Sequence, residues 1–258
     1  MAMSLIGPRW AVCCLTLGAS LFVLAAGDAA TLNPDVEPDE TIYAWELKHS
    51  GKYRLVWYYP TRNGVRANQP DRVLVHDKSF FIQPGVRPPT INGVYLLEHS
   101  TVHPGEAVLD IGTGTGVHAI FAADKAARTV ATDIYAPAVE NARINARLHG
   151  VDSQIDFRVG DLFEPIADGE QFDVFFVNIN FPFSTNDDKR NALHERLFSE
   201  IHQYMKPGAR IYYQTSFVRN IPTIHDMLTR NNFQIMEMHM EYFDEFKHEA
   251  LFLTVQQR

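Results

Sequence analysis

Three glycines at alternating positions follow an apolar run that contains one acid. The run is residues 108–111 and includes Asp110, and the glycines are Gly112, Gly114 and Gly116. The run predicts a buried strand, and the apolar residues after the last glycine predict a helix. A strand-to-helix turn with so few side chains lets a ligand lie against bare backbone. The sequence therefore predicts a ligand site here, although a glycine turn in some other α/β protein is an alternative.

The spacing of these glycines separates the turn from a pyrophosphate-binding turn. That fingerprint is Gly-x-Gly-x-x-Gly. Here the spacing is Gly-x-Gly-x-Gly, and Val117 stands where the fingerprint has its third glycine. The turn is therefore not predicted to hold a dinucleotide.

An acid ends the next predicted strand, residues 128–133. This acid is Asp133, which lies 21 residues after Gly112. At such a strand end, a carboxylate can accept both hydroxyls of a ribose. Ile134 follows and can lie against an adenine face. The alternative is that Asp133 only caps the helix that follows.

A second acid follows the third predicted strand, residues 154–159. Asp161 and Leu162 come directly after the strand, and a carboxylate here can accept the amino group of adenine. The carboxyl ends of parallel strands meet at one edge of a sheet, so Asp161 and Asp133 together are more specific than either alone. The alternative is a turn-forming aspartate.

Polar and aromatic residues follow the fourth predicted strand, residues 172–177. They are Asn178, Asn180, Pro182 and Phe183. An asparagine carbonyl can accept an N–H of a poorly nucleophilic, planar nitrogen and so turn its lone pair toward an electrophile. Phe183 can stack on such a planar group. The alternative is that the asparagines only stabilise the turn.

Alternating strands and helices position these residues, which predicts an α/β fold with a mostly parallel sheet and an antiparallel C-terminal edge. Besides those named above, the expected helices are residues 117–123, 137–149, 189–204 and 221–230, and the expected strands are 209–215, 233–241 and 251–255.

A smaller β unit is predicted before this core. Residues 53–59 and 72–75 are rich in aromatic and β-branched residues and flank a turn-prone Asn63-Gly64. We expect a hairpin unit that covers the mouth of the main domain, with plain edge packing as the alternative. A helix is expected over residues 91–99, with Thr90 as its N-cap.

Composition limits the other function classes. The net charge is -8 and no run of basic residues stands out, so no strong nucleic-acid-binding patch is expected. The only cysteines are Cys13 and Cys14, and the 11 histidines show no paired ligand spacing. We therefore expect no metal site.

The residue pattern of the N-terminus predicts a targeting or anchoring segment. Residues 10–27 contain no charge and follow Arg9, which is typical of a secretory signal peptide or a short membrane anchor. Either would associate the chain with a membrane or export it; otherwise the protein is cytoplasmic. The expected division is 1–30 signal peptide or anchor, 31–40 linker, 41–100 β-rich and helical extension, and 101–258 the α/β domain.

From about residue 80 to 255 the sequence resembles the methyltransferase small-domain family, which belongs to the class I S-adenosylmethionine (SAM) methyltransferases. The resemblance rests on residues 110–116, Asp133, 160–165, 172–173 and 206–208. It implies a Rossmann-like, doubly wound, seven-stranded sheet with SAM as methyl donor. The cofactor-binding residues that it implies are Asp110, Gly112, Thr113, Gly114, Gly116, Asp133, Ile134, Asp161 and Leu162.

The family's catalytic signature, Asn-Pro-Pro-Tyr or Asn-Pro-Pro-Phe at the exit of strand four, is degenerate in this chain. With Asn178 in the asparagine position, both prolines are replaced. With Asn180 there, Phe181 replaces the first proline, while Pro182 and Phe183 fit. The second register matches more residues but lengthens the strand exit by two. The degeneracy bears on the substrate more than on the cofactor.

The resemblance implies a SAM-dependent methyltransferase that acts on a nitrogen of a planar acceptor, such as a protein amide, a nucleobase or a metabolite. Two alternatives are an O-methyltransferase of a small molecule, with His118, His194 or His202 as base, and a non-catalytic SAM-fold scaffold protein at a membrane. The acceptor itself is not predicted.

Overall fold

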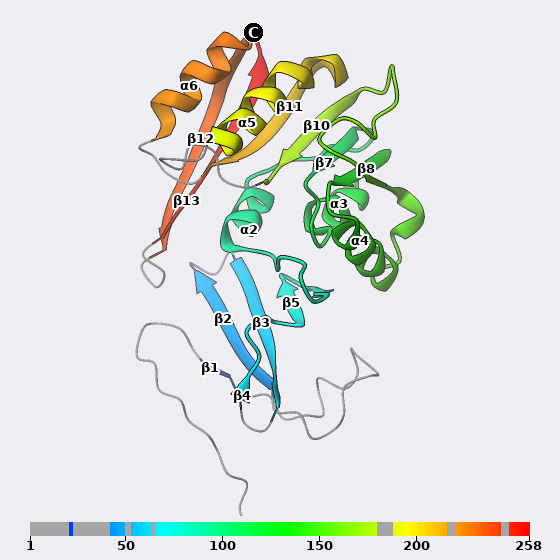
Figure 1. Ribbon diagram of the computed structural model, residues 1–258, viewed down its shortest axis with the longest axis vertical. Coiled ribbons are helices and arrows are strands. Elements are labelled where there is room, and N and C mark those ends of the chain that lie inside the picture. Colours follow the sequence, from blue (N-terminus) through cyan, green and yellow to red (C-terminus); the bar gives the residue numbers. More distant parts are fainter. Residues whose placement is uncertain are drawn as a thin grey trace, which may run out of the picture.

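The computed structural model describes residues 21–22, 42–49, 53–62, 65–179, 188–215, 220–243 and 248–258. These residues form a large α/β sheet with helices on both faces and a smaller antiparallel sheet, with helix α2 between the two sheets (Figure 1). Residues 10–27 lie outside the described part, except for Leu21 and Phe22.

The larger sheet has seven strands in the order β12-β13-β11-β10-β7-β8-β9. Five strands, from β9 to β11 across the sheet, are parallel, and β12 and β13 are antiparallel to their neighbours. This arrangement confirms the predicted Rossmann-like α/β fold with an antiparallel C-terminal edge. The strands are β7 (Ala107–Ile111), β8 (Arg128–Asp133), β9 (Ile155–Val159), β10 (Phe172–Val177), β11 (Met205–Thr215), β12 (Phe233–Phe243) and β13 (His248–Gln257).

Helices cover both faces of this sheet, so its central strands are apolar on both sides. One face packs against α2 (Ile91–Glu98), α3 (Val117–Ala123) and α4 (Ala136–Leu148). The other face packs against α5 (Asp188–Glu200) and α6 (Ile221–Arg230). Short 3-10 turns at Asp152–Gln154 and Ile201–Tyr204 complete the helical segments.

Two expected boundaries differ from the structure. The helix expected to run to residue 204 ends at Glu200 and continues as the 3-10 turn. Residues 206–208, expected to separate helix from strand, lie inside β11, because Met205 already pairs with Phe172. The pairing shifts register after Phe172, so the ladder accommodates the Pro-Gly segment as a bulge.

The smaller sheet has the order β1-β2-β3-β5-β6, with β4 paired to β3. The expected hairpin strands pair within it, from Leu55 opposite Val75 to Tyr58 opposite Arg72. The turn at Asn63-Gly64 lies outside the described residues. The strands are β1 (Leu21–Phe22), β2 (Ile42–His49), β3 (Tyr53–Arg62), β4 (Val65–Arg66), β5 (Arg72–Val75) and β6 (Lys78–Phe81).

The two sheets share one apolar core. Leu55, Trp57 and Phe80 of the smaller sheet belong to the same buried cluster as residues of α2, α3 and the large sheet. Thr90 caps α2 as predicted, because its hydroxyl accepts a hydrogen bond from the Gly93 N–H. The smaller sheet therefore fixes the position of α2.

Two asparagines one turn apart on α4 hold the strand β6 against the large domain. The Asn145 carbonyl accepts from Phe81 N at 2.8 Å, and its amide donates to Phe81 O and Thr115 O. Asn141 accepts from Gln83 N at 2.8 Å and donates to Phe81 O. Both side chains are fully buried, so these bonds align the segment that leads into α2.

Within the described part of the chain, no helix combines the length and the apolar character that crossing a bilayer requires. The predicted signal or anchor at residues 10–27 stays a prediction.

Replacing Asn145 with Ala tests the junction between β6 and α4. We expect the variant to lose about 2–4 kcal/mol of unfolding free energy, because the Phe81 N–H and the Thr115 carbonyl lose the Asn145 side chain as their partner. Urea denaturation measures the loss. Arg147→Ala, a change on the exposed side of the same helix, is the control, and an equal loss in both variants would contradict this role.

Candidate functional site

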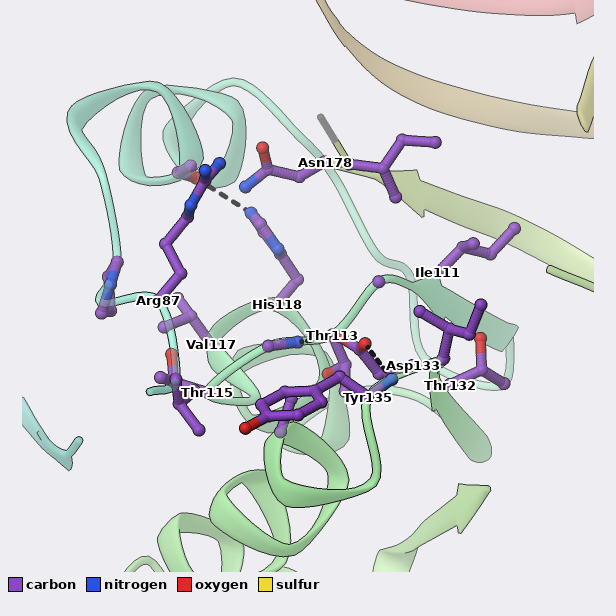
Figure 2. A pocket seen from close by; sticks show the side chains of 18 of the residues that line it. Arg87, Ile111, Thr113, Thr115, Val117, His118, Thr132, Asp133, Tyr135 and Asn178 are labelled. Atoms are coloured by element: carbon purple, nitrogen blue, oxygen red, sulfur yellow. Dashed lines mark hydrogen bonds between the residues drawn. The ribbon is translucent and has the colours of Figure 1, made fainter. Parts of the chain in front are cut away.

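A cavity of about 560 Å³ opens at the carboxyl ends of the parallel strands, between the glycine turn and α2 (Figure 2). Most of the residues predicted from the sequence line it: Gly112, Thr113, Gly114, Asp133, Ile134, Asp161, Leu162 and Asn178. The structure therefore brings the ends of four neighbouring strands to one site. Other lining residues come from the loop of residues 85–90 and from α2.

The glycine turn adopts backbone conformations that side chains disfavour. The φ angles of Gly112 and Gly114 are 72° and 57°. A Cβ on Gly112 would lie 2.5 Å from Ile179 Cγ2, whereas one on Gly114 would meet nothing closer than Gly112 O at 4.0 Å. The backbone at Gly114 is thus bare and faces open space, as a ligand cradle requires.

Asp110 supports this turn from below and does not line the cavity. It is fully buried, and its Oδ2 accepts from Thr113 Oγ1 at 2.7 Å and from Ala119 N at 3.2 Å. Burial raises the pKa of Asp110. In this structure Asp110 therefore contacts the turn and the start of α3, and its predicted contact with a cofactor stays a prediction.

Gly116 lies where α3 and α4 pack closely against each other. It is the N-cap of α3 with φ of 87°, and a Cβ on it would lie 3.0 Å from the Cβ of Ala142. Only glycine allows α3 and α4 to approach so closely. Gly116 is not among the residues that line the cavity.

Asp133 lies at the end of β8 and also holds the turn. Its Oδ2 accepts from Gly114 N at 3.0 Å, and its Oδ1 accepts from Tyr135 N at 2.9 Å. The next two side chains, Ile134 and Tyr135, are 69% and 47% exposed although both line the cavity. They form an apolar lip where a flat ring can pack.

Asp161 and Leu162 line the cavity after β9. The Asp161 carboxylate pairs with Arg196 of α5 at 2.6 Å. Leu162 has a φ of 50°, a left-handed conformation that is uncommon for a non-glycine residue. Such strain is frequently found at functional sites.

Asn178 is the strand-four asparagine that the structure places in the cavity. Its amide approaches Gly93 of α2 so closely that a Cβ there would lie 2.8 Å from Asn178 Nδ2. Asn180, Pro182 and Phe183 lie outside the described residues, so the choice between the two registers stays open.

His118 lines the cavity, but both its position and its hydrogen bonding are fixed by the protein. Its ring stacks on Phe176 with centroids 5.1 Å apart, and its Nε2 lies 2.9 Å from Gly93 O. A carbonyl only accepts, so Nε2 is the donor. His194 is buried against the Tyr213 hydroxyl, His202 is exposed on a 3-10 turn, and neither lines the cavity.

The sequence interpretation missed several lining residues. The loop of residues 85–90 forms one wall, with Arg87 in it, rather than the strands of the predicted hairpin. Figure 2 shows Arg87 on the left of the view, across from Ile111 on the right. The Pro88-Pro89 pair before a helix could have indicated a fixed loop, but nothing local indicated that it would meet the glycine turn.

Comparison with known proteins shows the family of this chain. A methyltransferase-domain family matches residues 102–252. Ribosomal protein L11 methyltransferases from Geobacillus thermodenitrificans and Halalkalibacterium halodurans are 29% and 28% identical over 68% and 79% of this chain. The chain spans only 54% and 62% of the length of these two relatives.

The fold is shared with a solved structure. The ribosomal protein L11 methylase of Lactobacillus delbrueckii subsp. bulgaricus has a TM-score of 0.55, at 21% identity, over 69% of this chain and 84% of that chain. The family match covers more than half of this chain and implies SAM as the cofactor, as predicted. The chain therefore belongs to the methyltransferase-domain family.

Proposed function

We propose that the protein is a SAM-dependent methyltransferase that methylates a nitrogen atom of a protein. The observation that carries the proposal is the cavity, where a bare glycine turn, carboxylates from two strand ends and the Asn178 amide meet. The finer resemblance to the small-domain family, with its degenerate signature, is part of this proposal.

The residues of the cavity fit the parts of SAM. The bare backbone of Gly112 to Gly114 suits the methionine portion, and the Asp133 carboxylate suits the ribose hydroxyls. Ile134 and Leu162 suit the adenine faces, and Asp161 suits the adenine amino group. When bound, SAM supplies a methyl group on a positively charged sulfur.

Asn178 is the residue that orients the acceptor in this mechanism. Its side-chain oxygen accepts an N–H of the acceptor and turns the nitrogen lone pair toward the methyl carbon. A C–N bond forms as the C–S bond breaks, the bonding electrons pass to sulfur, and a proton leaves the nitrogen. Alignment of this kind contributes up to about 7–11 kcal/mol of barrier lowering and needs no metal.

The state of His118 favours nitrogen over oxygen as the acceptor atom. An alcohol acceptor needs a base that can take its proton. His118 is the only histidine among the described residues that line the cavity. Its Nε2 is already bonded to Gly93 O, and its Nδ1 faces the buried Asp110 carboxylate at 3.8 Å rather than an acceptor. It therefore serves as a structural link between α3 and α2.

The names of the relatives support a protein as the acceptor. Both are ribosomal protein L11 methyltransferases, which favours a protein over a nucleobase or a metabolite. The competing proposal is a non-catalytic scaffold. Its support is the degenerate asparagine motif together with the apolar residues 10–27.

The Asp133→Ala variant tests the cofactor site. We expect SAM affinity to fall about 10- to 100-fold, because a charged hydrogen-bond acceptor for the ribose is lost and Gly114 N loses its partner. Calorimetric titration of the full chain measures the change. Asp152→Ala, which removes a carboxylate outside the cavity, should bind SAM as the wild type does. Unchanged affinity in Asp133→Ala would contradict the assignment.

The Asn178→Ala variant separates transfer from binding. We expect the single-turnover rate of methyl transfer to fall about 100-fold, with SAM affinity within threefold of wild type. Asn231→Ala, an asparagine at the end of α6, serves as the control. A variant that transfers methyl at the wild-type rate would exclude Asn178 as the orienting residue.

The acceptor class is tested with tritiated SAM and the protein, RNA and metabolite fractions of a cell extract. We expect label in the protein fraction that resists alkali, because N-methyl groups are stable where methyl esters hydrolyse. Label in RNA or in metabolites would overturn the protein acceptor. Bound SAM without label in any fraction would favour the scaffold.

A further inference from the structure

Three neighbouring strands of the large sheet carry aligned residues close to the cavity. Asp110, Phe176 and Tyr212 are paired neighbours on β7, β10 and β11. Side chains alternate along a strand, so the residues two positions further on lie on the same face. These are Gly112, Asn178 and Gln214, and all three line the cavity. Asn178 therefore lies between the cofactor turn and Gln214.

Gln214 has a feature that the proposed mechanism does not use. Its side chain is 2% exposed, yet its Nε2 has no hydrogen-bond partner among the described residues. A buried donor without a partner is destabilising, so nearly all such groups in native proteins are paired. The buried amide of Asn145, for comparison, donates to two backbone carbonyls.

We propose that Gln214 is a specificity-determining residue that donates a hydrogen bond to a carbonyl oxygen of the methyl acceptor. The inference rests on the proposed function, because it requires the acceptor to bind next to Asn178, on the side that faces away from the glycine turn. An acceptor nitrogen held by Asn178 then brings a nearby carbonyl oxygen to Gln214. Acceptors that lack such an oxygen leave the buried amide unpaired and are disfavoured.

Position on the strand separates this role from simple packing. The next residue, Thr215, is also buried, and its hydroxyl also lacks a partner among the described residues. Its side chain points to the opposite face of the sheet, and it does not line the cavity. Gln214 and Thr215 thus share burial and the missing hydrogen bond but differ in access to the ligand.

The experiment uses the full chain saturated with S-adenosylhomocysteine, whose binding is measured first. N-methylacetamide, which has a carbonyl oxygen, and N-methylthioacetamide, a neutral planar analogue with a weakly accepting sulfur in its place, are titrated and followed by NMR. In Gln214→Met we expect the Kd of N-methylacetamide to rise about three- to tenfold. The Kd values of N-methylthioacetamide and S-adenosylhomocysteine should stay within twofold of wild type.

Thermal unfolding without ligand supplies a readout that distinguishes binding from a structural role. Gln214→Met should unfold at a temperature no lower than wild type, because the buried donor that is removed has no partner among the residues that the structure describes. Thr215→Val, the matched control, should be as stable and should leave both probe affinities unchanged.

Three results would overturn the inference: an unchanged Kd for N-methylacetamide, equal weakening of both probes, or a Gln214→Met variant less stable than Thr215→Val. In these cases S-adenosylhomocysteine binding is retained and the proposed function stands. Failure of the wild type to bind S-adenosylhomocysteine would overturn the proposed function, and this inference with it.

Discussion

A glycine-rich backbone turn has to be held in place by its neighbours, and two carboxylates do this here. Asp110 bonds Thr113 and the start of α3 from inside the core, while Asp133 bonds Gly114 from the end of the adjacent strand. The turn is therefore rigid before a ligand arrives. Preorganisation of this kind lowers the entropy that binding must overcome. The other residues of the site surround this turn.

The smaller sheet contributes to the site indirectly, through the position of α2. Its apolar residues join the core of the large domain, and Asn141 and Asn145 align β6 on α4. This positions α2, whose Gly93 receives the His118 hydrogen bond and allows the Asn178 amide to approach. The wall of the cavity next to Asn178, where we propose that the acceptor binds, thus depends on an element that precedes the methyltransferase domain match, which begins at residue 102.

The sequence predicted the parts of the site that local patterns encode. The mostly parallel sheet with its antiparallel C-terminal edge follows from the alternation of strands and helices. Asp133 and Asp161 could be placed at strand ends because each ends or closely follows a strand that the sequence pattern predicts. The burial of Asp110 under the turn could not be predicted, because spacing alone does not show that a side chain is buried. Gln214, Gly93 and the loop at Arg87 could not be predicted, since their roles arise from packing between distant segments. The expected hairpin is part of a larger antiparallel sheet. Its additional strands could not be predicted, because the sequence of one strand does not show which other strands it pairs with.

The most direct test of this account is a crystal structure of the full chain with S-adenosylhomocysteine. The account predicts that the ligand lies in the cavity with its ribose hydroxyls on the Asp133 carboxylate and its sulfur facing Asn178. A ligand bound elsewhere, or one whose sulfur faces away from Asn178 and Gln214, would contradict it.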